Sequence, residues 1–201
     1  MKQIPATFRV GALSIAVLAV VVSGAAPTQS PFAVGAAHAQ DQTAKQDLPP
    51  YGTPDDVEYA GELWKQMTAA RLTGPERITA RPTKGEQPHA SIQQITSANV
   101  LEAGAKQRVV VKANHRGKGI NAVAVYEQPS RFLTGYAVMA KRPGYDLKNA
   151  DWFWAVFNPD GSLRKFKGKA IVGRVDTGAT NGCIGCHRKY GGKDFEMLTS
   201  K

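Results

Sequence analysis

The chain has 201 residues, of which 42% are hydrophobic, and this length suits one domain with a single core. It carries 26 Lys and Arg against 16 Asp and Glu, a formal net charge of +10 at pH 7. The basic residues are spread along the chain and do not gather in one helix, which argues against nucleic-acid binding. Two cysteines are too few for a small fold that depends on several disulfides.

Residues 1–39 have the pattern of a removed export signal. Lys2 and Arg9 precede an apolar run at 10–22, and Ala37-His38-Ala39 is a small-x-small cleavage site, with 23–25 as a less favoured earlier one. The run is thirteen residues long, which is short for a membrane-spanning helix. We therefore expect a periplasmic protein with no membrane span after signal removal; a retained membrane anchor is the alternative.

The mature chain is expected to begin with a leader and then fold as one domain. Residues 40–53 are polar and punctuated by prolines, which is typical of a flexible leader, and residues 54–201 would form the domain. A helix should open this domain, because Thr53 can cap it and Pro54 suits its first position. Its predicted core-facing stripe is Val57, Ala60, Trp64 and Met67.

The middle of the chain predicts a loop followed by strands. Residues 73–89 contain prolines, a glycine and charges, so we expect a loop there, with His89 on the surface. Five β-rich runs follow, at 108–113, 122–127, 134–142, 151–157 and 170–175, and turns are expected at 114–117, 143–146 and 158–161. His115 falls in the first turn and is expected to be exposed. Short connections between successive strands indicate an antiparallel sheet and an α+β fold class.

The pentapeptide Cys183-Ile184-Gly185-Cys186-His187 near the C-terminus has the spacing that attaches a c-type haem. Its thiols can add to the two vinyl groups of one porphyrin, and the imidazole of His187 can bind the iron. Two alternatives use the same cysteines, a redox disulfide and half of a zinc site. A redox motif of this kind should open a helix in a βαβ unit, and zinc would need a second ligand pair, which His38, His89 and His115 do not supply by spacing. We therefore predict one covalently bound haem c, held by Cys183 and Cys186, with His187 as its metal ligand.

Five segments together resemble the cytochrome P-460 and cytochrome c′-β family, over about residues 88–198. They are Val123-Ala124-Val125-Tyr126-Glu127, the run 135–142, the run 149–157, the haem motif with Asn181-Gly182 before it, and Lys193-Asp194-Phe195. The resemblance implies a strongly bent antiparallel sheet with a few flanking helices that enclose one haem. It also implies a five-coordinate iron whose distal side is open to a small molecule, and a homodimer, since family members are often dimers.

The chain departs from the resemblance at one position of the distal side. In cytochromes P-460 a lysine that precedes a glutamate is linked to the haem, and here Tyr126 stands before Glu127. Lys112, in a neighbouring strand, is the one residue that could substitute. Tyr126 would donate a hydrogen bond to a bound ligand and Glu127 would move protons, although neighbours in a strand point to opposite faces. Phe132 is the candidate for an apolar cap, and Trp154, on one strand face with Trp152 and Val156, is a candidate to line the haem.

These residues lead to three functional predictions. The preferred one is a periplasmic monohaem cytochrome that binds or turns over small nitrogen oxides, above all nitric oxide. The second is an oxidoreductase that oxidises hydroxylamine, as the resemblance to cytochromes P-460 implies. The third is plain electron transfer, which needs a sixth ligand from the protein; Met197, His89 and His115 are all poorly suited to that role by sequence. A basic surface favours an acidic redox partner.

Overall fold

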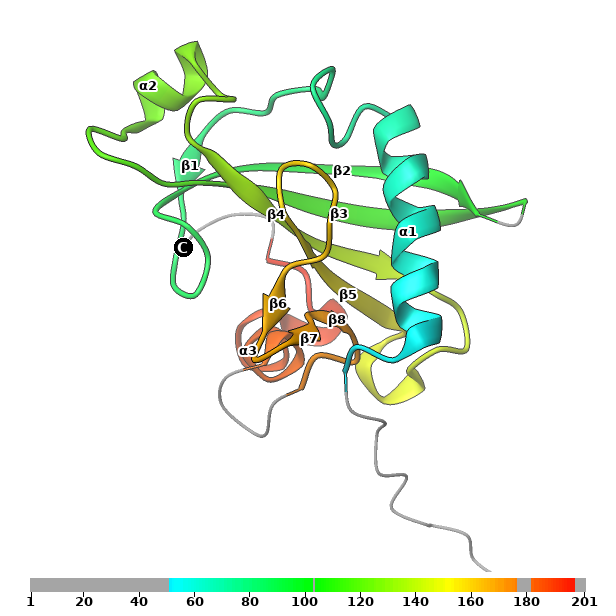
Figure 1. Cartoon of the computed structure of the whole chain (residues 1–201). Helices are drawn as coiled ribbons and strands as arrows, with labels where there is room; N and C mark the ends of the chain where they lie inside the picture. The colour runs from blue at the N-terminus through cyan, green and yellow to red at the C-terminus, as the bar shows by residue number, and fades with distance from the viewer. Residues whose placement is uncertain (1–50, 103, 177–181, 198–201) are drawn as a thin grey trace, which may run out of the picture. The chain divides into compact units, whose positions relative to one another are not determined.

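The computed structural model describes residues 51–102, 104–176 and 182–197 (Figure 1). They belong to a compact unit that spans Lys45–Lys201. The expected export signal at 1–39 and most of the expected leader at 40–53 lie outside the described residues. Within the described part, no helix has the length and apolar character that crossing a membrane requires.

A six-stranded antiparallel sheet forms the centre of this unit, in the order β1-β2-β3-β4-β5-β8. A separate two-stranded ribbon, β6–β7, lies beside it (Figure 1). The strands are β1 (Thr83–Lys84), β2 (Ile92–Glu102), β3 (Ala105–His115), β4 (Leu133–Lys141), β5 (Trp152–Phe157), β6 (Lys165–Phe166), β7 (Lys169–Ala170) and β8 (Val172–Gly173). The antiparallel sheet with few helices agrees with the α+β prediction.

Five short or medium helices accompany the sheet. They are α1 (Pro54–Ala69), α2 (Ala122–Glu127), α3 (Cys183–Tyr190) and the 3₁₀ turns η1 (Leu147–Asn149) and η2 (Gly192–Asp194). Helix α1 runs across one face of the sheet in Figure 1. Its start agrees with the prediction, because the Asp56 N–H donates to Thr53 Oγ1 at 3.2 Å and Pro54 opens the first turn.

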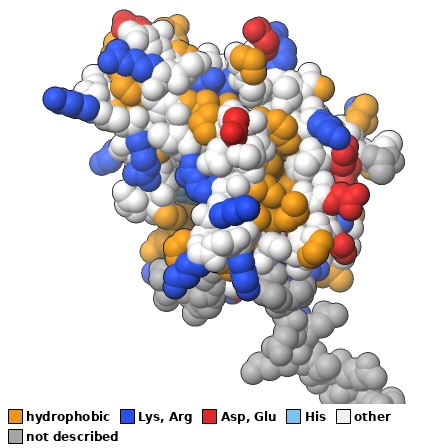
Figure 2. Space-filling model, viewed as in Figure 1, with side chains coloured by type: hydrophobic (Ala, Val, Ile, Leu, Met, Phe, Trp, Pro, Cys, Tyr) orange, Lys and Arg blue, Asp and Glu red, His pale blue; other side chains and the backbone are white. Residues whose placement is uncertain are grey.

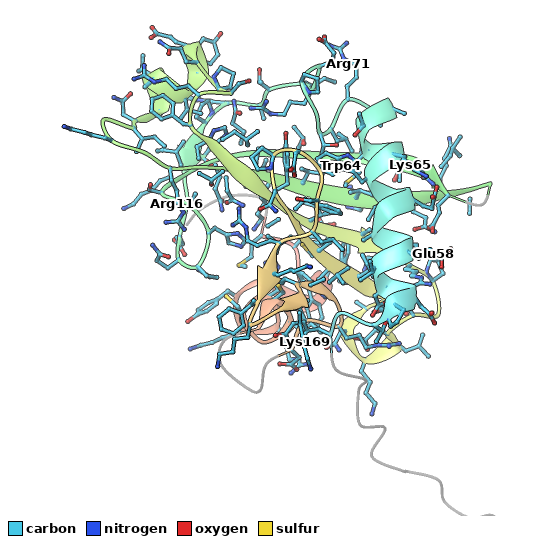
Figure 3. All side chains as sticks on the ribbon, viewed as in Figure 1. Glu58, Trp64, Lys65, Arg71, Arg116 and Lys169 are labelled. Carbon is cyan, nitrogen blue, oxygen red and sulfur yellow. The ribbon has the colours of Figure 1, made fainter. Side chains whose placement is uncertain are left out.

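The stripe that α1 buries differs in part from the predicted one. Ala60 and Met67 are buried as expected, whereas Val57 is exposed and Tyr59 and Leu63 take core positions instead. Trp64 packs at the rim of the core, with its ring 5.6 Å from that of Tyr136 and 5.0 Å from that of Phe157 (Figure 3). Compared with the predicted stripe, the buried face of α1 is therefore shifted around the helix toward Tyr59 and Leu63.

The sheet separates two buried apolar clusters because side chains alternate between its faces. On the face that meets α1, β3 contributes Val109, Val111 and Ala113. On the opposite face, Val110 packs with Met139, Trp152, Trp154, Val175, Ile184 and Phe195. The haem motif belongs to this second face, since Ile184 lies inside its cluster.

Two predictions for the middle of the chain are wrong. Residues 122–127 form helix α2 and no strand, because Asn121 caps the helix by accepting the Ala124 N–H at 2.9 Å. His115 does not lie in an exposed turn: β3 continues through it, and its side chain is 0% exposed. The long strand β2, which pairs with β3 from Ile92↔His115 to Glu102↔Ala105, was not anticipated because its sequence is rich in Gln, Thr, Ser and Asn.

Candidate cofactor-binding site

The helix α3 presents the three residues of the haem motif on one side. Cys183, Cys186 and His187 stand at positions i, i+3 and i+4, which share a helix face. Ile184 anchors the helix, because its side chain is fully buried in the second cluster and its N–H donates to the Val175 carbonyl at 3.2 Å. This anchoring fixes which face of α3 the motif occupies.

That face borders a cavity of about 610 Å³, a size usual for a cofactor or ligand pocket. Cys183, Cys186 and His187 all line it. Its walls come from β3, β4 and β5, from the loop before β2, and from the β6–β7 ribbon, and they include Ala137, Val138, Met139, Trp154, Ala155, Val156, Phe166, Ile171 and Val175. The cavity therefore joins two cysteines and a histidine to a largely apolar chamber.

Two contacts hold the imidazole of His187. Its Nδ1 lies 2.6 Å from the Phe195 carbonyl oxygen, which can only accept, so Nδ1 carries the proton and donates. The ring of Trp154 packs against it edge-on at 4.7 Å. Burial, together with the nearby Lys112 charge, lowers the pKa of His187 to about 4, against the smaller raising effect of the Phe195 bond. The ring is thus neutral at pH 7 with Nε2 as its free lone pair, the form in which histidine binds metals.

Both cysteines are half-buried, and no disulfide joins them in the described part of the chain. Burial, the main cause, raises the pKa of Cys183 to about 12. The thiol is therefore protonated and weakly nucleophilic at pH 7, unlike the low-pKa thiolates of redox-active Cys-x-x-Cys sites. Cys183 therefore lacks the thiolate character that favours thiol–disulfide exchange.

Cations and no carboxylates stand among the described residues that line the cavity. Lys112, Arg116 and Arg164 reach it, and His89 lies there too. Lys112 is only 4% exposed, and burial lowers the pKa of its amine against the opposing effect of the two motif thiols. Trp154 Nε1 is a buried donor without a partner in the described part of the chain. The polar groups of the cavity therefore suit a ligand that carries negative charge or hydrogen-bond acceptors.

This donor set fits a covalently attached haem. The thiols and His187 supply the anchors and an iron ligand, the apolar wall suits a porphyrin face, and the cations suit its two propionates. Among the described residues no three His, Cys, Asp or Glu side chains gather as a site for a metal ion. A haem iron takes four of its ligands from the porphyrin nitrogens and therefore needs no such cluster of protein side chains.

The predicted distal residues do not lie in the cavity. Tyr126 and Glu127 belong to α2, where Tyr126 is 72% exposed, and neither residue lines the chamber. Phe132 is buried elsewhere, beside Gly117, with Arg131 over its ring. Trp154, in contrast, lines the cavity, and its ring packs against that of His187.

Sequence reasoning considered Lys112 only as a substitute for the cross-linking lysine, and it did not place Asn114 in the site. Lys112 and Asn114 share one face of β3, and alternation from the apolar Val110 could have revealed them. His89, expected on the surface, is half-buried and lines the cavity. Its position depends on contacts between distant segments, which no local pattern reports. His115, on the opposite face of β3, does not line the cavity.

Comparisons of the chain with protein-family models, with curated proteins and with solved structures gave no match.

Proposed function

We propose that this protein is a monohaem c-type cytochrome whose haem iron binds or turns over small nitrogen oxides, nitric oxide first among them. The observation that carries the proposal is one cavity of about 610 Å³ lined by Cys183, Cys186 and the oriented His187. When bound, the haem would supply an iron centre for ligand binding and one-electron chemistry. The export signal expected at 1–39 makes the periplasm the proposed location.

The residues of the cavity have separate tasks in this proposal. Cys183 and Cys186 would hold the haem through thioethers, and His187 would supply an imidazole ligand to its iron. Trp154 and the Phe195 carbonyl hold the His187 ring, and hydrogen bonding at Nδ1 strengthens a histidine as a ligand. The apolar lining would keep water away from a haem bound there, and this exclusion of water would tune the reduction potential of the haem.

A basic rim supports an acidic electron partner. Lys165, Lys167 and Lys169 are exposed on and around the ribbon β6–β7, and Phe166 between them lines the cavity while remaining 54% exposed. Figure 2 shows Lys and Arg side chains gathered over this region. Such a surface attracts an acidic protein by long-range steering and offers an aromatic contact near the haem edge. A homodimer stays an expectation from the family resemblance alone.

Lys112 favours a second candidate, hydroxylamine oxidation by a cross-linked haem of the P-460 type. Tyr126, at the sequence position matched to the cross-linking lysine, is exposed on α2, whereas Lys112 is buried in the cavity that holds the motif. A lysine amine there, with its pKa lowered by burial, is a better nucleophile than an ordinary surface lysine. The position of Lys112 therefore supports hydroxylamine oxidation as the second candidate function.

Optical spectra of the purified protein, ferric and dithionite-reduced, with and without nitric oxide, test the two candidates. The proposal expects an ordinary haem c spectrum that changes when the gas is added. A strongly red-shifted ferrous band that reverts to haem c in Lys112→Met would instead establish the cross-linked enzyme. A reduced spectrum indifferent to nitric oxide would overturn ligand binding and leave electron transfer.

A further inference from the structure

Two histidine rings lie near each other in the lining of the candidate haem cavity. The ring centroids of His89 and His187 lie 6.2 Å apart, with their planes at 79°. Both rings line the cavity, although they come from segments almost a hundred residues apart in the chain. The only other aromatic ring in contact with His187 among the described residues is Trp154.

The spacing of the two rings matches a shared metal. A metal-bound imidazole nitrogen lies about 2 Å from its metal, so two imidazoles on opposite sides of one metal place their ring centroids about 6 Å apart. Nearly perpendicular ring planes are compatible with such an arrangement, because each ring can rotate about its own metal–nitrogen bond. Within the described part of the chain, neither nitrogen of the His89 ring has a hydrogen-bond partner, so no protein group competes for its lone pair.

The backbone around His89 is tied to β3. The guanidinium of Arg116, at the end of β3 (Figure 3), donates to the His89 carbonyl at 2.9 Å and to the Pro88 carbonyl at 3.3 Å. The Ala90 N–H donates to Asn114 Oδ1 at 3.3 Å. Arg116 and Asn114 themselves line the cavity, so the loop is held at its edge by residues of the site. His89 is thereby presented to the cavity from the loop between β1 and β2. The ends of this loop pair through Lys84↔Ile92 and through the Gly85 N–H, which donates to the Ser91 carbonyl at 2.9 Å, whereas its middle is held by side-chain bonds.

We propose that His89 is the distal iron ligand, so that the resting haem is six-coordinate and an incoming gas has to displace His89. This inference rests on the proposed haem function. It adds that His89 controls the access of a gas to the iron. A loop held by a few side-chain hydrogen bonds can release the ring more readily than a strand could. The apparent affinity for nitric oxide or carbon monoxide is then reduced by the fraction of protein in which His89 is bound.

Two other cavity residues could take the same position, and variants separate them. Met139 and Lys112 line the cavity and carry lone pairs. The test compares ferric electron paramagnetic resonance and optical spectra of the mature protein with those of His89→Ala, Met139→Leu and Lys112→Met. We expect low-spin spectra with two-imidazole character for the parent protein, high-spin spectra for His89→Ala alone, and recovery of the low-spin form when free imidazole is added to His89→Ala.

Gas binding gives an independent readout. Carbon monoxide mixed with the reduced protein should bind about tenfold faster or more in His89→Ala than in the parent, because no internal ligand has to leave. Tyr126→Phe, on the exposed helix α2, is the matched control and should bind at the parental rate.

The outcomes that overturn the inference differ from those that overturn the proposed function. A parent protein with covalent haem but a high-spin spectrum would show that His89 is not an iron ligand. A low-spin spectrum that is lost in Met139→Leu or Lys112→Met but kept in His89→Ala would show the same. Both results would leave the proposed cytochrome function standing. Absence of covalently bound haem from the mature protein would overturn both.

Discussion

The Nδ1–H of His187 donates to the carbonyl of Phe195 at 2.6 Å, and this bond joins helix α3 to the turn that follows it. The ring therefore cannot rotate without losing a buried hydrogen bond, which costs about 1–3 kcal/mol. The position of the imidazole in the cavity is therefore held by the protein's own contacts.

Replacement of His187 should separate haem attachment from haem ligation. The proposed haem function predicts that His187→Ala keeps the haem on Cys183 and Cys186, because thioethers are covalent, and that it loses the low-spin ferric signal. Haem staining of a denaturing gel and electron paramagnetic resonance measure the two effects. A low-spin signal of parental form and intensity in this variant would show that another residue is the proximal ligand.

Gly161 should be intolerant of a side chain because it lies against Trp64. It has φ of +90°, and a Cβ there would come within 2.4 Å of the Trp64 ring. We expect Gly161→Ala to lower the free energy of unfolding by about 2–4 kcal/mol, from backbone strain plus overpacking. Chemical denaturation of the parent and the variant measures this difference in the free energy of unfolding.

Gly144→Ala is the matched control for that loss. Gly144 has φ of +78° but nothing within 4 Å of its added Cβ, so it should lose only about 1–2 kcal/mol of backbone strain. Equal losses in the two variants would contradict the contact with Trp64.

His115 should make the protein less stable in mild acid. Burial, aided by the Arg77 charge, lowers the pKa of His115 to about 4 from its usual 6.5. The unfolded chain therefore holds more protons than the folded one between these values. The contribution of neutral His115 is fully present above pH 6.5 and is lost as pH falls toward 4, by at most about 3 kcal/mol.

Urea unfolding of the parent and of His115→Gln between pH 4 and 7 measures this effect. His89 and His187 are present in both proteins, so their titrations cancel in the comparison. The variant should show a flatter dependence on pH. Parallel curves would mean that His115 is protonated equally in the folded and unfolded chains.

The basic residues at the cavity rim should speed reactions with anions. In the triple variant Lys165→Gln, Lys167→Gln, Lys169→Gln, oxidation of the reduced protein by ferricyanide should slow several-fold at low salt and depend less on ionic strength. Stopped-flow absorbance measures the rate. Lys65→Gln, an exposed lysine of α1 paired with Glu62, is the control and should react at nearly the parental rate; an equal slowing would mean that net charge and not this surface governs the reaction.

The sequence predicts best those elements whose signals are local. Thr53 and Pro54 locate the start of α1, and the aromatic run 151–157 yields β5 within one residue. The helix α3, which puts Cys183, Cys186 and His187 on one face, was not predicted from the sequence. Local propensity misleads at 122–127, where valines suggest a strand but an Asn121 cap on an exposed segment produces a helix.

The remaining parts of the site depend on tertiary contacts. His89 reaches the cavity because Asn114 of β3 and Arg116, just after this strand, hold its loop. Lys112 is buried against the usual preference of lysine for solvent, and such a local inconsistency is typical of functional positions. His115 and Lys112 stand three residues apart on one strand and therefore on opposite faces, a distinction that depends on knowing that β3 continues past Asn114.

Peptide mass spectrometry of the mature protein, purified from periplasm, tests the central claim most directly. The account predicts that the peptide containing residues 183–187 carries one haem through two thioethers, at Cys183 and Cys186. A peptide recovered without haem, with free thiols or with a Cys183–Cys186 disulfide, would contradict it.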